Sequence, residues 1–203
     1  ANGYGALNSN NTGSGNTANG LQALQTNTTG GNNTANGSYS LKSNTTGSYN
    51  TANGTSALKS NTTGDENTAN GYGALNSNNT GSGNTADGYL ALKSNTTGSY
   101  NTANGLNALY SNTTGYNNTA IGYGALSSNT TGRYNTALGQ RTNVSSGNLH
   151  NATAIGDGAT VTANDKVRIG NSSVRDIEGQ VAWTSVSDGR IKENVQEAVP
   201  GLS

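Results

Sequence analysis

The chain of 203 residues carries no net charge, because ten basic residues balance ten acidic ones, and it contains no cysteine. Nucleic acids and anionic membranes are bound by clustered Lys and Arg, so this balance disfavours both partners, and the missing thiols exclude disulfides and thiolate metal sites. Only 30% of the residues are hydrophobic and only 10% are charged, whereas disordered chains usually combine low hydrophobicity with high charge. We therefore expect an ordered chain with a small apolar core, no metal, no cofactor and no membrane insertion.

A 17-residue repeat occupies most of the sequence. Its first eight copies follow A-N-G-x-x-A-L-x-S-N-T-T-G-x-x-N-T, and the alanine that opens each copy recurs from Ala1 to Ala154 without an insertion. We number the places of the repeat from this alanine, place one, to place seventeen. A strict period of this length predicts a solenoid in which each copy forms one coil.

Within each coil, the pattern predicts two corners and two strands. Place three is always Gly, from Gly3 to Gly156, which favours a corner with positive φ or close backbone approach. The N-T-T-G at places ten to thirteen has the residue preferences of a type I turn and predicts the second corner. The segments between them, N-T-A-N and A-L-x-S, are of strand length and unsuited to helix. We predict two β-strands per coil, each stacked in parallel on the same strand of the next coil.

Stacking of identical coils produces ladders of identical side chains. At a strand spacing of roughly 4.8 Å, Asn amides in such a ladder can bond from coil to coil. Ordering 17 residues costs roughly 17 to 34 kcal/mol, while burying one Leu and two Ala contributes only a few kcal/mol. The apolar core of a single chain is therefore too small to offset this entropy cost. Assembly into a parallel cyclic oligomer would bury more surface.

The repeat changes character toward its C-terminal end. Place two is Asn or Asp in the first seven copies and then becomes Ile121, Leu138 and Ile155. Regular spacing is lost after about residue 163. We therefore divide the chain into a β-roll repeat shaft (1–163), a neck or connector (164–186) and a C-terminal segment (187–203).

The stretch NATAIGDGATVTANDKVRIGN, residues 151–171, resembles the head repeats of trimeric autotransporter adhesins, and its Ala-Ile-Gly matches best together with that of residues 120–122. The resemblance implies a left-handed parallel β-roll built as a homotrimer. The predicted fold class is thus all-β: a parallel β-solenoid of left-handed β-roll type with 17-residue coils, assembled as a parallel homotrimeric rod. The 17-residue period and the Asn at place two depart from the adhesin pattern, which leaves open whether place two faces inward or outward.

The segment WTSVSDGRIKENV, residues 183–195, resembles the opening of the endosialidase-type intramolecular chaperone at the C-terminal end of phage tail fibres. In that family the domain trimerises, assists folding of the upstream β-rod and then cleaves itself off. The resemblance implies Ser187 as nucleophile, Lys192 as its base and Val186–Ser187 as the scissile bond. The shared pattern S-D-x-R-x-K-x-N falls on Ser187, Asp188, Arg190, Lys192 and Asn194.

The chemistry of this motif sets a geometric condition. A Lys can activate a Ser if partial burial lowers its pKa enough to leave it neutral. Five residues apart, the two side chains meet only if a turn separates them, and Asp188-Gly189 is suited to that turn before an apolar helix face that begins at Ile191. The alternative is that Ser187 and Asp188 merely cap this helix.

Tyrosines occupy variable places that we expect to point outward. Exposed Tyr can stack on sugars or proteins, although a plain solvated spacer is the alternative interpretation. The single His150 cannot form a metal cluster and is expected at the surface. The candidate surface-binding residues are Tyr4, Tyr49, Tyr72, Tyr89, Tyr100, Tyr123 and Tyr134.

Together these features predict an extracellular structural fibre or adhesin shaft, on a phage virion tail or a bacterial cell surface. The shaft would project a binding end, be trimerised by a C-terminal chaperone, and have as partners copies of itself and a cell-surface glycan or protein receptor. We expect no enzyme activity of the shaft beyond one self-cleavage at the chaperone junction. The alternative is a ligand-binding solenoid whose tyrosines hold glycans, or whose Thr column orders water or ice (Thr12, Thr29, Thr46, Thr63).

Overall fold

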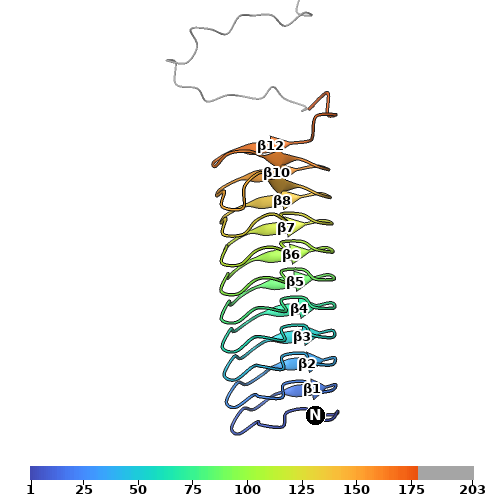
Figure 1. Cartoon of the computed structure of the whole chain (residues 1–203), viewed down its shortest axis with the longest axis vertical. Coiled ribbons are helices and arrows are strands. Elements are labelled where there is room, and N and C mark those ends of the chain that lie inside the picture. The colour runs from blue at the N-terminus through green and yellow to red at the C-terminus, as the bar shows by residue number, and fades with distance from the viewer. Residues whose placement is uncertain (178–203) are drawn as a thin grey trace, which may run out of the picture. The chain divides into compact units, whose positions relative to one another are not determined.

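The computed structural model describes residues 1–177, and Ala1–Ser173 form one compact unit. Within this unit, ten parallel strands stack along one axis in the order β1 to β8, β10, β12, and β9 and β11 form a second parallel pair (Figure 1). Residues 1–177 contain no helix. The strands are β1 (Thr17–Asn19), β2 (Thr34–Asn36), β3 (Thr51–Asn53), β4 (Thr68–Asn70), β5 (Thr85–Asp87), β6 (Thr102–Asn104), β7 (Thr119–Ile121), β8 (Thr136–Leu138), β9 (Asn143–Val144), β10 (Thr153–Ile155), β11 (Thr160–Val161) and β12 (Val167–Ile169).

The register of the large sheet follows the 17-residue period. Thr17 pairs with Thr34, and the same step continues along the sheet as far as β10, so every place forms a column of equivalent residues. The last step is shorter, because Thr153 pairs with Val167 only 14 residues later. The predicted parallel β-solenoid of 17-residue coils is confirmed, with one shorter coil between β10 and β12.

The strands alternate between the core and the outside. In each T-A-x strand the Ala is fully buried, whereas the Thr and the residue at place two face outward. Place two, whose direction the sequence left open, therefore lies on the outer face of the sheet. In β12 the Ala column ends at the exposed Arg168, which lies in register with Ala154 and closes the apolar column with a charged group.

The second predicted strand is wrong for coils one to eight and right for the last two. In the early coils A-L-x-S is a turn segment in which the buried Leu has left-handed φ, as at Leu24 with 50°. Its backbone still bonds to the next coil, since Leu24 N donates to Ser40 O at 3.0 Å. Where place eight becomes Val144 and Val161, the segment extends into β9 and β11. β-branched residues resist positive φ, so they select the strand.

Both predicted corners are present, but the second is closed differently from a type I turn. At the first, Gly20 has φ of 139°, and a Cβ there would lie 2.5 Å from Gly37 O. At the second, Asn27 Nδ2 donates to Gly30 O at 2.9 Å, while Gly30 N donates to Thr45 O of the next coil at 3.4 Å. A side chain thus supplies the closing bond and leaves the backbone amide to hold the next coil.

Two columns of buried asparagine share the interior with Ala and Leu. Asn67 Nδ2 donates to Asn50 Oδ1 at 3.1 Å and to Gly81 O at 2.9 Å, and its Oδ1 accepts from Asn84 N at 3.0 Å. The predicted Asn ladders are confirmed, and they satisfy buried backbone groups as well as one another. The fully buried members are Asn27, Asn44, Asn61, Asn78, Asn95, Asn112 and Asn129 at place ten, and Asn33, Asn50, Asn67, Asn84, Asn101, Asn118 and Asn135 at place sixteen.

Substitution Asn67→Ala is expected to lower the free energy of unfolding by about 2 kcal/mol or more, because it leaves the buried Asn84 N without a partner and removes one of the two side-chain donors to Gly81 O. Asn79→Ala is the matched control. It removes an exposed side chain whose Oδ1 accepts from Thr62 Oγ1 at 2.6 Å, and this hydroxyl keeps the backbone acceptor Asn79 O, so the expected cost is below about 1 kcal/mol. Guanidinium unfolding at one fixed chain concentration measures both, and equal midpoints would contradict a structural role for the buried ladder.

Candidate functional site

The sequence-predicted site residues fall into two groups. The self-cleavage residues Ser187 and Lys192, with Asp188, Arg190 and Asn194, lie outside the described residues. The candidate tyrosines are all exposed and occupy two separate columns. Those at place four follow the Gly corner (Tyr4, Tyr72, Tyr89, Tyr123), and those at place fifteen precede the buried place-sixteen Asn (Tyr49, Tyr100, Tyr134).

Cationic side chains lie beside two further tyrosines, Tyr39 at place five and Tyr110 at place eight. Lys42 Nζ and Lys59 Nζ lie 5.4 and 5.7 Å from the ring centroid of Tyr39, and Lys93 Nζ lies 5.1 Å from that of Tyr110. These distances are within the range of cation–π attraction. We call the surface formed by places four, five and eight the tyrosine–cation face. Its members are Tyr39, Tyr72, Tyr89, Tyr110, Tyr123, Lys42, Lys59, Lys93 and Arg141.

A hollow opens on this face at Gly124. Place five carries a side chain in most coils, and Gly124 leaves that space empty: a Cβ there would meet nothing within 4 Å. The hollow has a volume of about 370 Å³, which lies at the lower end of the usual range for ligand sites. Its lining residues are Asn107, Tyr123, Gly124, Ser127, Arg141 and Asn143.

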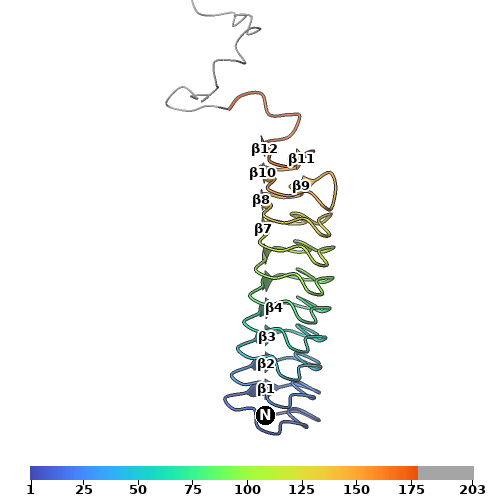
Figure 2. The ribbon, with the colours of Figure 1, turned by 90° about the vertical axis from the view of Figure 1, so that its left-hand side faces the viewer.

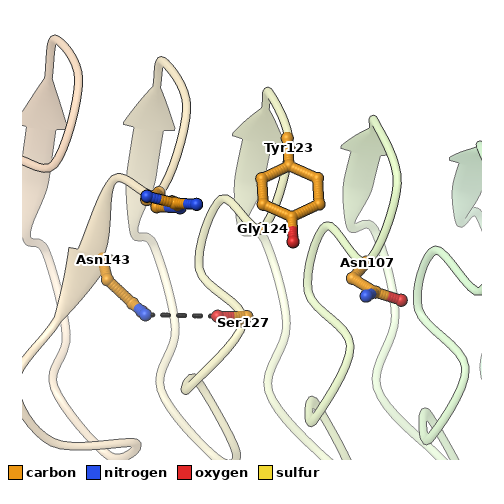
Figure 3. A pocket seen from close by; sticks show the side chains of 6 residues that line it. Asn107, Tyr123, Gly124, Ser127 and Asn143 are labelled. Atoms are coloured by element: carbon orange, nitrogen blue, oxygen red, sulfur yellow. Dashed lines mark hydrogen bonds between the residues drawn. The ribbon is translucent and has the colours of Figure 1, made fainter.

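The polar groups of the Gly124 hollow are held by a local network (Figure 3). Asn143 Nδ2 donates to Ser127 Oγ at 3.3 Å, so the Ser127 hydroxyl can donate its own hydrogen into the hollow. Asn143 is fixed in turn because its Oδ1 accepts from Val144 N at 2.9 Å. The Arg141 guanidinium lies 5.8 Å from the Tyr123 ring centroid. The hollow therefore combines an aromatic wall, a hydroxyl and a permanent positive charge.

Asn107 lies at the other side of the hollow. Figure 3 shows its amide nitrogen on the side of Tyr123 and its oxygen on the far side. Its Oδ1 is buried without a hydrogen-bond partner, and no other residue of 1–177 has such an atom. A buried polar atom without a partner is unusual, and it leaves this amide uncommitted within the protein.

A second hollow of about 380 Å³ lies three coils earlier, at Gly73, where the Leu90 side chain takes part of the space and a Cβ on Gly73 would lie 2.7 Å from its Cδ2. Its aromatic wall is the pair Tyr72 and Tyr89, whose rings stack with centroids 5.3 Å apart and an interplanar angle of 13°. Lys59 and Lys93 supply the positive charge. Neither hollow is lined by a carboxylate, so both are positively charged sites on a chain without net charge.

Within residues 1–177, no three His, Cys, Asp or Glu side chains come together as a metal site would require. The same residues hold no helix long and apolar enough to cross a bilayer. His150 is partly exposed, and its Nε2 lies 4.0 Å from Asp165 Oδ2.

No protein-family model matches this chain, and neither a curated protein nor a solved structure is detectably similar to it.

Sequence reasoning found Tyr72, Tyr89 and Tyr123 but missed the cations and amides that accompany them. The available signal was the pair Tyr-Gly at places four and five, since a Gly where other coils carry a side chain leaves a gap in the column. The Arg141 contribution could not be read from one copy of the repeat, because this residue comes from the following coil.

The pKa of Lys93 tests whether a cation and a tyrosine of this face interact directly. Its Nζ donates to Tyr110 Oη at 3.0 Å, and this hydrogen bond raises the pKa of Lys93 above its ordinary 10.5. Tyr110→Phe is expected to lower the pKa of Lys93 toward 10.5, as measured by NMR titration of its side chain. A raised folded-state pKa stabilises the fold below pH 10.5, and this contribution is lost as the pH rises through the folded value. An unchanged Lys93 titration in Tyr110→Phe would contradict the assignment, and Tyr134→Phe is the control.

Proposed function

We propose that this chain is the structural shaft of an extracellular fibre or adhesin, assembled as a parallel homotrimer through the outer face of its ten-stranded sheet. The observation that carries the proposal is an apolar column on that face. The place-two residues Ile121, Leu138 and Ile155 pair in register with one another and, in the last coil, with Ile169. Within this column, 47% of the surface of Leu138 is exposed in the single chain.

The surroundings of this apolar column favour contact with another protein surface. Thr lines the neighbouring outward column along the strands, and the place-two column before Ile121 consists of Asn with the single charge of Asp87. Asn19 Nδ2 donates to Asn36 Oδ1 at 2.9 Å, so this ladder is ordered in the single chain. A sheet face that is regular, nearly uncharged and apolar at one end resembles an interface more than a solvated surface.

Another copy of the same chain is the partner that fits best. In a parallel assembly about an axis along the solenoid, each residue meets its own equivalent at the same height, so the apolar column meets itself. Asn can both donate and accept, and therefore also matches itself across such an axis. An antiparallel arrangement would place the apolar column against the Asn ladder. Three copies is the number implied by the resemblance to trimeric adhesins.

The core of a single coil gives a second reason for assembly. Coils one to eight bury at most one Leu and two Ala as apolar side chains, with the two Asn columns completing the interior. Burial of this size contributes only a few kcal/mol per coil, and burial of the strand face between chains would add to it.

Sedimentation tests the assembly. The wild-type chain is expected at three times its 20.4 kDa mass at micromolar concentration. Leu138→Glu is expected to weaken assembly by a hundredfold or more, because it brings three carboxylates together in a buried interface, at about 3 kcal/mol or above. Leu106→Glu is the matched control, since Leu106 is 42% exposed but lies at place four, off the strand face. A monomeric wild type, or a Leu138→Glu variant that remains assembled, would contradict the proposal.

The resemblance of residues 183–195 to a self-cleaving chaperone supports the fibre function and has its own test. The chain expressed from its complete gene is expected to release a species that ends at Val186. Ser187→Ala should remain uncleaved because the nucleophile is gone, and Lys192→Arg should also fail because a guanidinium cannot act as a neutral base. Ser185→Ala is the control and should cleave normally. Identical intact masses for wild type and Ser187→Ala would exclude self-cleavage at this bond.

A further inference from the structure

We infer that the tyrosine–cation face binds an acidic oligosaccharide, with a sugar carboxylate beside Arg141 at the Gly124 hollow. This goes beyond the shaft function and does not depend on it. The face occupies places four, five and eight, whereas the proposed assembly uses places seventeen and two on the strands. Because the Gly corner separates these two surfaces, a trimer formed through the strands leaves the hollows accessible.

The shape of the Gly124 hollow suits a sugar ring. Its volume of about 370 Å³ is bounded by the exposed Tyr123 ring, which offers an apolar surface to the C–H face of a sugar. The backbone of the hollow is already ordered by bonds between coils, such as Gly124 N to Leu106 O at 2.9 Å. A ligand therefore does not have to order the site before it binds.

The polar groups select the charge of the ligand. Arg141 presents a planar set of N–H donors that matches a carboxylate, and within the described residues its guanidinium is in no ion pair. The Ser127 hydroxyl adds a donor for ring hydroxyls, and the Asn107 amide nitrogen, which lies on the side of Tyr123, adds another (Figure 3). With no carboxylate in the lining, an anionic ligand meets no repulsion.

The second hollow indicates an extended ligand. Gly73 and Gly124 are three coils apart, which corresponds to about 14 Å along the axis at the usual strand spacing. Lys59 and Lys93 repeat at the Gly73 hollow the positive charge that Arg141 provides at the other. Two like sites in line on one face suit an oligosaccharide that lies along the solenoid.

A single-stranded nucleic acid fits this face less well. The cations from Lys42 to Arg141 extend over six coils, or about 29 Å. A DNA strand carries roughly one charge per 3.4 Å, so roughly eight phosphates would face only four cations. Sparse charge combined with amide and hydroxyl donors favours a ligand whose charges are spaced by sugar rings.

Isothermal titration with a hyaluronan octasaccharide, in which every second sugar carries a carboxylate, tests the proposal, with its fully methyl-esterified form as the neutral control. Binding of the acid and at least tenfold weaker binding of the ester are expected. Gly124→Leu fills the hollow with a residue that place five already holds at Leu90, with φ of 55°, and should weaken binding about tenfold. Gln22→Leu introduces the same residue in the same column away from the hollow, and should bind as wild type.

Arg141→Gln should also weaken binding of the acid about tenfold, whereas Arg133→Gln, which removes the same charge at place fourteen, should not. Equal binding of acid and ester, no binding of the acid, or unchanged binding in Gly124→Leu would overturn the proposal. Tighter binding of an octamer of deoxythymidylate would overturn it in favour of nucleic acid. Sedimentation of the same samples reports the assembly separately, so failure of the shaft proposal is distinguishable.

Discussion

The structure depends on one interaction, the hydrogen bonding of a buried asparagine to its equivalent in the next coil. The Asn61 amide, for example, donates to Asn44 Oδ1 at 2.8 Å and to Gly64 O at 2.9 Å of its own coil, and its Oδ1 accepts from Asn78 Nδ2 at 2.8 Å. This chain of bonds closes the corner and fixes the register at once. Because each amide must find the same amide 17 residues later, a single inserted residue would leave buried polar groups without partners. The strands of the sheet stack along the axis in the register that these bonds set (Figure 2).

A core built from Asn, Ala and one Leu has consequences for the outside of the molecule. The interior columns repeat with little change over eight coils, whereas places two, four, five, eight, fourteen and fifteen vary. Variation there alters the surface without disturbing the ladder. The change from Asn104 to Ile121 converts a polar strand face into an apolar one, and the change from Asn107 to Gly124 opens a hollow. Both proposed activities therefore arise on one scaffold by substitutions at outward places.

The left-handed leucines show the cost of closing such a short coil. Leu24 and its equivalents hold φ near 50°, a conformation that costs a residue of this type about 1 to 3 kcal/mol. Burial of the Leu side chain offsets a comparable amount. In the last two coils Val144 and Val161 take over the buried position from the place-seven Leu, and the segment becomes a strand. The same segment of the coil therefore forms either a left-handed turn or a strand, depending on whether its buried apolar residue is branched at Cβ.

The sequence by itself determined the solenoid, its 17-residue coil, the Gly corners and the Asn ladders, because strict repetition forces equivalent residues into columns whatever the details of the coil. It also marked the tyrosines as exposed. The tertiary structure alone decided that place two faces outward, that A-L-x-S is a left-handed turn in most coils, and that Arg141 lies beside Tyr123. These features depend on how the chain bends within a coil and on which residues of adjacent coils become neighbours, and a repeat pattern fixes neither.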